Sequence, residues 1–138
     1  MPTAKEFTVS VEDRPGQIGK LCRALADRGV NILAFQAFPS DGKTLTRFVA
    51  DNPTTAKTVL DTERYTYSET EVAQVKFPHR PGELARAASR LGESNININY
   101  GYGGLEAGTN APLLIFGVAE VARAATILEQ LSAAAASA

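Results

Sequence analysis

The sequence predicts an α+β fold made of two copies of one β-α-β-β-α unit. A shift of 66 residues places Arg14-Pro15-Gly16 on Arg80-Pro81-Gly82, and Asn31-Ile32 on Asn97-Ile98. Apolar residues alternate before each Arg-Pro-Gly motif, as they do in a strand that buries one face. After each motif they recur at i, i+3, i+4 and i+7, the stripe of an amphipathic helix. The same order of strand and helix signals therefore occurs twice in 138 residues.

The first helix of each copy begins next to the Arg-Pro-Gly motif. Pro15 and Pro81 are expected in the first helical turn, where a missing N–H costs nothing. Gly29 and Asn95 are expected to end these helices, because both residues tolerate a left-handed backbone. The apolar residues of these strands and helices are Phe7, Val9, Val11, Ile18, Leu21, Cys22 and Leu25 in the first copy and Ala73, Val75, Phe77, Leu84, Ala87, Ala88 and Leu91 in the second.

Two further strands and a second helix follow in each copy. In the first copy the strands are expected at residues 30–38 and 44–50, and the helix at residues 54–61. Asn52-Pro53 is a suitable N-cap and first helical position for that helix. In the second copy the expected elements are strands at residues 96–102 and 112–118, a Gly-rich loop at residues 103–110, and a helix that starts near Val121.

Residues 65–77 carry strand signals for both the end of the first copy and the start of the second. A βαββαβ order is the split βαβ, or ferredoxin-like, unit. We therefore expect two such units side by side, in residues 1–70 and 71–138. The second unit lacks a fourth strand of its own, because its last helix runs into the tail 132–138. Either residues 65–68 or a second chain is expected to pair with the strand left open.

Composition argues against several classes of function. Fifteen acidic and fourteen basic residues leave a net charge of −1, so there is no electrostatic reason to bind nucleic acid or an anionic membrane. One Cys and one His cannot form a disulfide and are too few for a Cys/His zinc site. No apolar run approaches the ~18 residues that span a bilayer. A reducing cytoplasm is the expected location.

The Arg-Pro-Gly motif lies where a strand turns into a helix. The first N–H groups of that helix, expected at residues 16–18 and 82–84, have no helical partner. The helix dipole adds partial positive charge, and Gly lets a ligand approach the backbone. The motif therefore predicts a site for a small anion such as a carboxylate, with a plain strand–helix turn as the alternative. Asn31 and Asn97 open the second strands, where they can bind polar ligand groups or simply start a strand.

These residues resemble the signature of the ACT domain family. In the first copy the matching segments are Asp13-Arg14-Pro15-Gly16, Gly29 and Val30-Asn31-Ile32. In the second they are His79-Arg80-Pro81-Gly82 and Ile96-Asn97-Ile98. The resemblance implies ferredoxin-like modules that bind small molecules, most often amino acids, and regulate a metabolic enzyme. It also implies that two units pair through their second strands into one continuous antiparallel sheet with the helices on one face.

The resemblance further implies two ligand sites at the seam between units. One would join residues 13–18 to Asn97, and the other would join residues 79–84 to Asn31. The loop N–H groups would hold a carboxylate, and the Asn, with Asp13 in the first site, would hold an ammonium group. The two sites are not expected to bind one ligand equally, because the loops differ in sequence. The implied ligand-binding residues are Asp13, Arg14, Pro15, Gly16, Gln17, Ile18, Asn31, His79, Arg80, Pro81, Gly82, Glu83, Leu84 and Asn97.

Three functions follow from the sequence. The leading hypothesis is a non-catalytic regulatory protein that binds an amino acid and acts through a metabolic enzyme or through its own homodimer. The second is a protein-interaction subunit whose ligand sites are degenerate. The third is an acyl-phosphate hydrolase, because some ferredoxin-like enzymes use an Arg in this loop with a strand Asn, as Arg14 and Asn31 could be used. No pair of base and nucleophile is visible, so no catalytic residue, metal or cofactor is expected.

Overall fold

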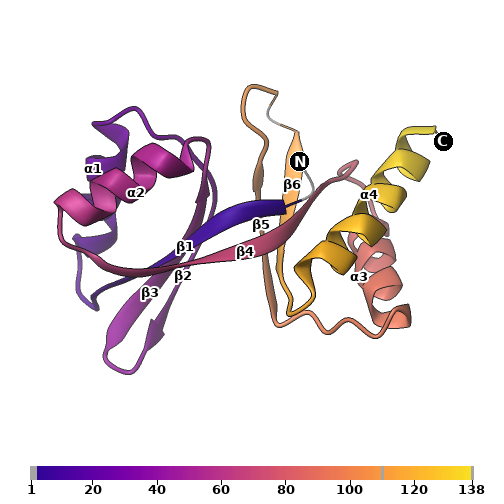
Figure 1. The fold of residues 1–138 in the computed structure, drawn as a ribbon, viewed down its shortest axis with the longest axis horizontal. Coiled ribbons are helices and arrows are strands. Elements are labelled where there is room, and N and C mark those ends of the chain that lie inside the picture. The colour runs from indigo at the N-terminus through magenta and orange to yellow at the C-terminus, as the bar shows by residue number, and fades with distance from the viewer. Residues whose placement is uncertain (1–2, 110, 138) are drawn as a thin grey trace. The chain divides into compact units, whose positions relative to one another are not determined.

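The structure is a computed structural model that describes residues 3–109 and 111–137 (Figure 1). It divides into two compact units, residues 5–70 and residues 71–137 together with 3–4. The elements are β1 (Thr3–Glu12), α1 (Gln17–Ala26), β2 (Ile32–Ser40), β3 (Lys43–Ala50), α2 (Pro53–Thr62), β4 (Thr66–Lys76), α3 (Glu83–Glu93), β5 (Tyr100–Leu105), β6 (Pro112–Gly117) and α4 (Val121–Ser137). The predicted α+β class and the β-α-β-β-α order of each copy are confirmed.

The first unit is an antiparallel sheet with two helices on one face (Figure 1). Strand β3 is central, between β1 and β2, and its register places Phe48 opposite both Phe7 and Phe35. The rings of Phe7 and Phe48 stack with centroids 5.4 Å apart. The alternating apolar residues of these strands therefore bury one face of the sheet in the core, as the sequence predicts. The buried core residues are Phe7, Val9, Val11, Leu21, Leu25, Val30, Phe48, Ala50, Ala56, Val59 and Leu60.

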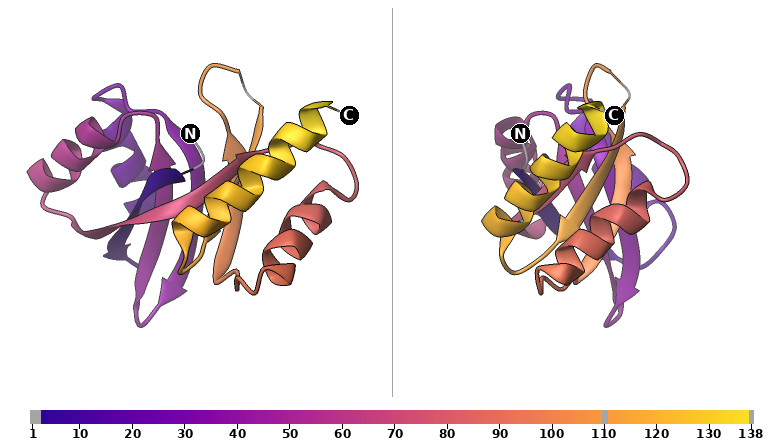
Figure 2. Two further views of the ribbon diagram at one scale, coloured as in Figure 1. Left: turned by 45° about the vertical axis from the view of Figure 1, so that its right-hand side comes forward. Right: turned by 90° about the vertical axis from the view of Figure 1, so that its right-hand side faces the viewer.

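The second unit repeats this arrangement with its own core. Strand β6 is central, between β4 and β5, and places Phe116 opposite Ala73 and Gly101. Figure 2 shows α3 and α4 of this unit. The Tyr100 ring lies against Gly117, where an added Cβ would be 2.2 Å from ring atoms, so only Gly fits there. The buried core residues are Ala73, Val75, Ala87, Leu91, Ile96, Phe116, Val118, Ala124, Leu128 and Leu131.

Strand β4 ends the first unit and begins the second without a break, as the signals in residues 65–77 predict. No strand follows α4 among the described residues, so the second unit lacks a fourth strand after its last helix. The Thr3 carbonyl lies at this edge and accepts a hydrogen bond from Gln74 Nε2 at 3.4 Å. The prediction that residues 65–68 pair with the open strand is wrong, because residues 66–68 are themselves part of that strand, β4. Pairing with a second chain stays a prediction.

Left-handed residues mark both ends of the first helix in each unit. Gly16 and Gly82 precede α1 and α3 with φ of 89° and 91°. The predicted helix ends are confirmed, because Gly29 and Asn95 have φ of 74° and 61°. The prediction for Pro15 and its counterpart is wrong by two residues, since both prolines lie in the turn before the helix.

The second strands start later than predicted. Strand β2 begins at Ile32 rather than at residue 30, and β5 begins at Tyr100 rather than at residue 96. Both Asn31 and Asn97 therefore lie just before a strand. Strand β5 also extends into the predicted loop 103–110, as far as Leu105, and Asn110 of that loop lies outside the described residues. The expected tail is helical, because α4 continues to Ser137.

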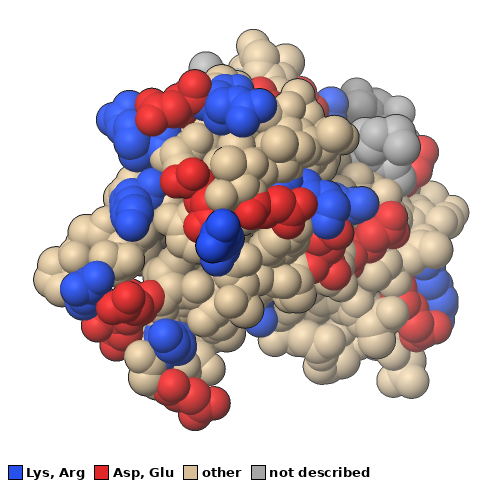
Figure 3. Space-filling model, turned by 60° about the vertical axis from the view of Figure 1, so that its left-hand side comes forward, with Lys and Arg blue, Asp and Glu red and all other residues tan. Residues whose placement is uncertain are grey.

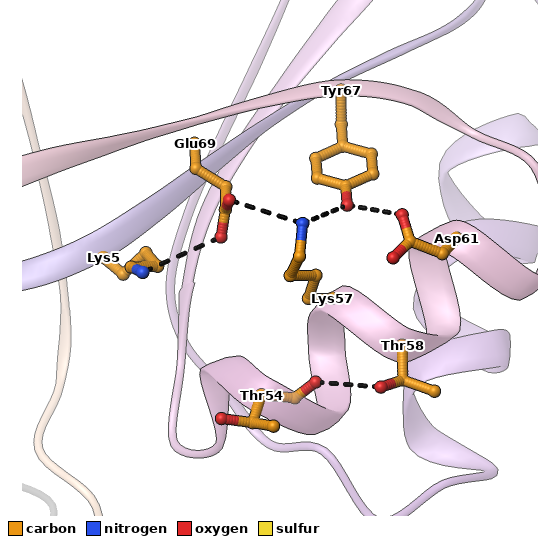
Figure 4. Close-up of polar contacts among 7 residues, drawn as sticks. All are labelled: Lys5, Thr54, Lys57, Thr58, Asp61, Tyr67 and Glu69. Carbon is orange, nitrogen blue, oxygen red and sulfur yellow. Dashed lines mark hydrogen bonds and ion pairs between the residues drawn. The ribbon is translucent and has the colours of Figure 1, made fainter.

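A polar network joins α2 to β4 in the first unit (Figure 4). Lys57 Nζ donates to Tyr67 Oη at 3.0 Å and lies 3.5 Å from Glu69 Oε2. Tyr67 Oη donates in turn to Asp61 Oδ1 at 2.5 Å. Glu69 also lies 3.9 Å from Lys5 of β1. The hydrogen bond to Tyr67, followed by the charge of Glu69, raises the pKa of Lys57 above its ordinary value of 10.5.

We predict opposite effects for two Gly→Ala changes at the two ends of α1. Gly29→Ala should destabilise the protein by about 1 kcal/mol or more, because Ala disfavours a positive φ. Gly19→Ala should stabilise it by about 0.5–1 kcal/mol, because Gly19 is inside the helix and an added Cβ meets nothing within 4 Å. Urea denaturation measures both, and shifts of the same sign would contradict the assignment of these backbones.

The Lys57 network predicts a pH dependence of stability. A raised folded pKa means that the protonated lysine stabilises the native state below pH 10.5, and that this stability is lost as pH rises above 10.5. Lys57→Met should therefore lose less stability than the wild type across this window. Lys20→Met is a matched control on an exposed helical lysine. Equal pH profiles for the two variants in urea denaturation would show that the network contributes nothing.

Candidate functional site

The first Arg-Pro-Gly loop connects β1 to α1 through a tight turn. The Arg14 N–H donates to the Glu12 carbonyl at 3.0 Å, and the Gln17 N–H donates to the Arg14 carbonyl at 3.4 Å. Gly16 then takes φ 89° and ψ −14°, a conformation that other residues adopt only with strain. Nothing lies within 4 Å of a Cβ built on Gly16, so the space above this backbone is open.

Three amides at the start of α1 have no hydrogen-bond partner within the described part of the chain. They belong to Gly16, Ile18 and Gly19, whereas the Lys20 N–H already donates to the Gly16 carbonyl at 3.0 Å. The sequence analysis placed Gln17 in this set, but its N–H is used by the turn. The three free donors and the helix dipole favour an anion at this end of α1.

The second loop has nearly the same backbone. Gly82 has φ 91° and ψ −14°. The Arg80, Glu83 and Arg86 N–H groups donate to the carbonyls of residues 78, 80 and 82 at 3.0, 3.4 and 2.9 Å, matching the first loop bond for bond. The unpartnered amides, within the described residues, are those of Gly82, Leu84 and Ala85. The repeat seen in the sequence is thus present in the main chain.

Side chains distinguish the two loops. In the first, Asp13 Oδ1 accepts a hydrogen bond from Thr44 Oγ1 at 2.9 Å, and Arg14 Nε lies 3.0 Å from Glu12 Oε2. In the second, His79 replaces Asp13 and is exposed. Glu83 there lies between two arginines, 3.1 Å from Arg80 Nε and 3.5 Å from Arg86 Nη1. The two loops therefore have nearly the same backbone conformation but different charged side chains.

The two asparagines lie far from the loop of their own unit. Asn31 is held by Asp51, which accepts from the Asn31 N–H at 2.9 Å and donates to its carbonyl at 3.0 Å. This is the Ala50 end of β3, whereas the loop follows Glu12, which pairs with Lys43 at the other end. The two ends of β3 are about 23 Å apart at 3.3 Å per residue. In the second unit, Asn97 Nδ2 donates to Asn99 Oδ1 at 2.9 Å.

This separation affects the expectation that Arg14 and Asn31 could act together in catalysis. Arg14 and Asn31 cannot act on one acyl phosphate within the first unit, because they lie at opposite ends of the sheet.

Burial raises the pKa of the Cys22 thiol, which makes a thiolate nucleophile less available. Within the described residues no cluster of three or more His, Cys, Asp or Glu could hold a metal ion. The pairing of residues 13–18 with Asn97, and of residues 79–84 with Asn31, stays a prediction.

Two threonines beside the first loop were missed by the sequence analysis. Thr44 and Thr46 of β3 lie opposite Val11 and Val9, on the face that carries the core. Both are buried, and Thr46 Oγ1 has no hydrogen-bond partner among the residues that the structure describes. In the second unit Leu114 lies opposite Val75, the copy of Val9, so the corresponding face is apolar. The signal that could have identified them is their place at alternate positions of a strand, in step with the core residues Phe48 and Ala50.

Cavities within the units lie elsewhere. A groove of about 210 Å³ in the second unit is lined by Gln74, Lys76, Glu106, Glu129 and Ser132, among others. Two of its charged groups pair with each other, since Lys76 Nζ lies 3.1 Å from Glu106 Oε2. A second cavity of about 190 Å³ lies between α1 and α2. We place the candidate site at the first loop, where amides unpartnered within the described residues lie beside the exposed Asp13 carboxylate held by Thr44.

The charged side chains on one face of the surface are mixed in sign. On the face drawn in Figure 3, Lys and Arg side chains lie beside Asp and Glu, and no field of one sign dominates. Neighbouring charges also form ion pairs within helices, such as Arg123 with Glu120 at 3.2 Å. None of the helices described is both long and apolar enough to cross a membrane.

Known proteins share this fold. A protein from Bacteroides thetaiotaomicron has a TM-score of 0.80 at 20% identity, covering 94% of this chain and 88% of that one. The regulatory subunit of aspartate kinase from Thermus thermophilus, in its ligand-free form, has a TM-score of 0.61 at 17% identity, covering 94% and 91%. The corresponding Thermus flavus subunit has 0.61 at 16%, covering 94% and 92%. No curated protein matches the sequence significantly.

The family comparison finds a match within the first copy. Residues 6–64 match the family model of the ACT domain. This segment begins inside β1, ends just after α2 and includes the whole first loop. Assignment of the second copy to the same family stays a prediction from its residues. The first Arg-Pro-Gly loop, which connects β1 to α1, therefore lies within the segment that matches the ACT domain model.

Proposed function

We propose that this chain is a non-catalytic regulatory protein whose first loop binds the carboxylate of an amino acid. The observation that carries the proposal is the set of unpartnered amides at Gly16, Ile18 and Gly19, at the start of α1. They lie beside an open left-handed glycine in a domain that matches the ACT family. A carboxylate accepts such N–H donors without needing a positively charged side chain.

Further residues of the loop support an amino acid as the ligand class. The Asp13 carboxylate is exposed and is positioned by Thr44, so it can pair with an ammonium group. We propose that Asn97 completes the first site and that Asn31 completes the second. In this proposal the units form a continuous sheet with the ligands at their seam, and residues 1–70 and 71–138 are the two ACT domains.

We propose that the output passes to a metabolic enzyme or through a homodimer. The support is a fold shared with regulatory subunits of aspartate kinase from two Thermus species. A chain of this kind regulates by binding one packing of its units more tightly than another. A subunit with degenerate ligand sites is the second candidate, favoured by the two arginines that already neutralise Glu83 of the second loop.

The test is a thermal-shift screen against the standard amino acids at millimolar concentration. A ligand at about 100 times its Kd stabilises the native state by about 2.7 kcal/mol, which raises Tm by several degrees. We expect one amino acid, or a few related ones, to produce this shift. Absence of a shift with every amino acid would contradict the proposal.

Substitution of the loop glycines tests the location. Gly16→Asn should remove the ligand-dependent shift, because Asn tolerates a positive φ but places a side chain in the open space above the loop. Gly82→Asn is the matched control, with the same backbone conformation in the second unit. An undiminished shift in Gly16→Asn would place the ligand elsewhere.

A further inference from the structure

We propose that a groove along the free edge of β4 in the second unit, the edge that does not face β6, binds an extended segment of a partner protein that carries a lysine or arginine. The proposal does not depend on amino-acid binding, because the groove lies outside both Arg-Pro-Gly loops. It begins from a difference between the two units. A strand follows the second helix of the first unit, whereas no strand follows α4 among the described residues.

In the first unit, the strand after α2 lies along the edge of β1. The Tyr67 ring meets the Phe7 ring edge-on, with centroids 6.0 Å apart, and Glu69 Oε1 lies 3.9 Å from Lys5 Nζ. Figure 4 shows that the same strand contacts α2, where Lys57 Nζ lies 3.5 Å from Glu69 Oε2. This strand therefore supplies a charge opposite to that of the helix beside it.

In the second unit, the corresponding place beside β4 is a groove. The shift of 66 residues places Ser10 of β1 on Lys76 of β4. The described part of β1 reaches the free edge of β4 at Thr3, whose carbonyl accepts a hydrogen bond from Gln74 Nε2 at 3.4 Å. Beyond this contact the groove has a volume of about 210 Å³, and it is lined by residues 74–76, by Glu106 and Leu113, and by Glu129 and Ser132 of α4. The groove thus occupies the position of a missing strand.

The backbone of β4 presents a free donor to this groove. The Phe77 N–H donates to the Pro112 carbonyl of β6 at 3.4 Å. Because successive residues of an antiparallel strand bond to opposite edges, the N–H and C=O of Lys76 face away from β6. The Lys76 carbonyl accepts from Ser132 Oγ at 3.4 Å, and its N–H has no partner within residues 3–109 and 111–137. An extended peptide can bond such an edge as an added strand.

The charges of the groove favour a basic side chain on the incoming segment. Lys76 Nζ lies 3.1 Å from Glu106 Oε2, so these two charges offset each other. Glu129 of α4 is exposed, and its carboxylate has no partner among the described residues. In the first unit the helix charge of Lys57 is met by Glu69 of the neighbouring strand. A lysine or arginine on the added strand would meet Glu129 in the same way.

The test uses the full chain and five-residue peptides with blocked ends that alternate valine with a charged residue. In NMR titrations, the valine–lysine peptide should shift the amide resonances of Val75, Lys76 and Ser132 saturably, and should leave those of residues 43–50 in the first unit unchanged. The valine–glutamate peptide should bind at least about fivefold more weakly, because its carboxylates repel Glu129. A valine–lysine peptide methylated on every backbone nitrogen should bind at least about tenfold more weakly, because it cannot donate to β4.

Two matched variants test the charge. Glu129→Gln should weaken binding of the valine–lysine peptide about two- to fivefold, the range expected for one exposed ion pair. Glu120→Gln is the control, because Glu120 immediately precedes the same helix and pairs with Arg123 outside the groove. It should leave binding unchanged. Both positions are exposed, so both variants should fold as the wild type does.

The proposal is overturned if the valine–lysine peptide shifts none of the three amides, if the glutamate or the methylated peptide binds as tightly, or if the two variants weaken binding equally. Shifts of the same amides on raising the concentration of the protein alone would overturn it in favour of a second copy of this chain. Failure of the peptides to bind would leave the amino-acid screen unaffected, since that screen and the Gly16 variant report on the first loop.

Discussion

The start of the first helix in each unit depends on one glycine held in a left-handed backbone. Gly16 and Gly82 reverse the chain within a few residues, so the strand before them and the helix after them can pack on one core. The same conformation leaves three amides exposed at the helix start in each loop. Fold and candidate site thus share one constraint, because a change that relaxes the glycine backbone also moves the donors.

Local signals in the sequence were enough where a residue's own conformational preference decides the structure. Gly29 and Asn95 end their helices with positive φ, since few other residues tolerate it. The start of β5 could not be predicted from local preferences in the same way. Residues 96–99 have the alternation of a strand, yet Asn99 already donates its N–H to the Gly117 carbonyl while the regular ladder begins only at Tyr100. Ladder pairing depends on the partner strand, which local alternation does not contain.

In the candidate site, too, some features follow from the local sequence and others depend on distant contacts. The Arg-Pro-Gly spacing located both loops, but hydrogen bonding inside the turn decided which amides are free, and Gln17 proved to be used. Thr44 reaches Asp13 across 31 positions of the chain. Such a contact follows from the register of β3 against β1, which no short motif encodes. The difference between the loops similarly depends on the conformation of the Glu83 side chain, which helical spacing alone does not predict.

The continuity of β4 has a consequence for how this chain can be divided. The strand serves the first unit up to Thr70 and the second from Glu71, with no linker between them. A gene fragment cut at that boundary would divide β4 between the two pieces. Thr3 would also be separated from Gln74, its hydrogen-bonding partner. Neither unit can therefore be removed without truncating a strand of the other, even though each has a core of its own.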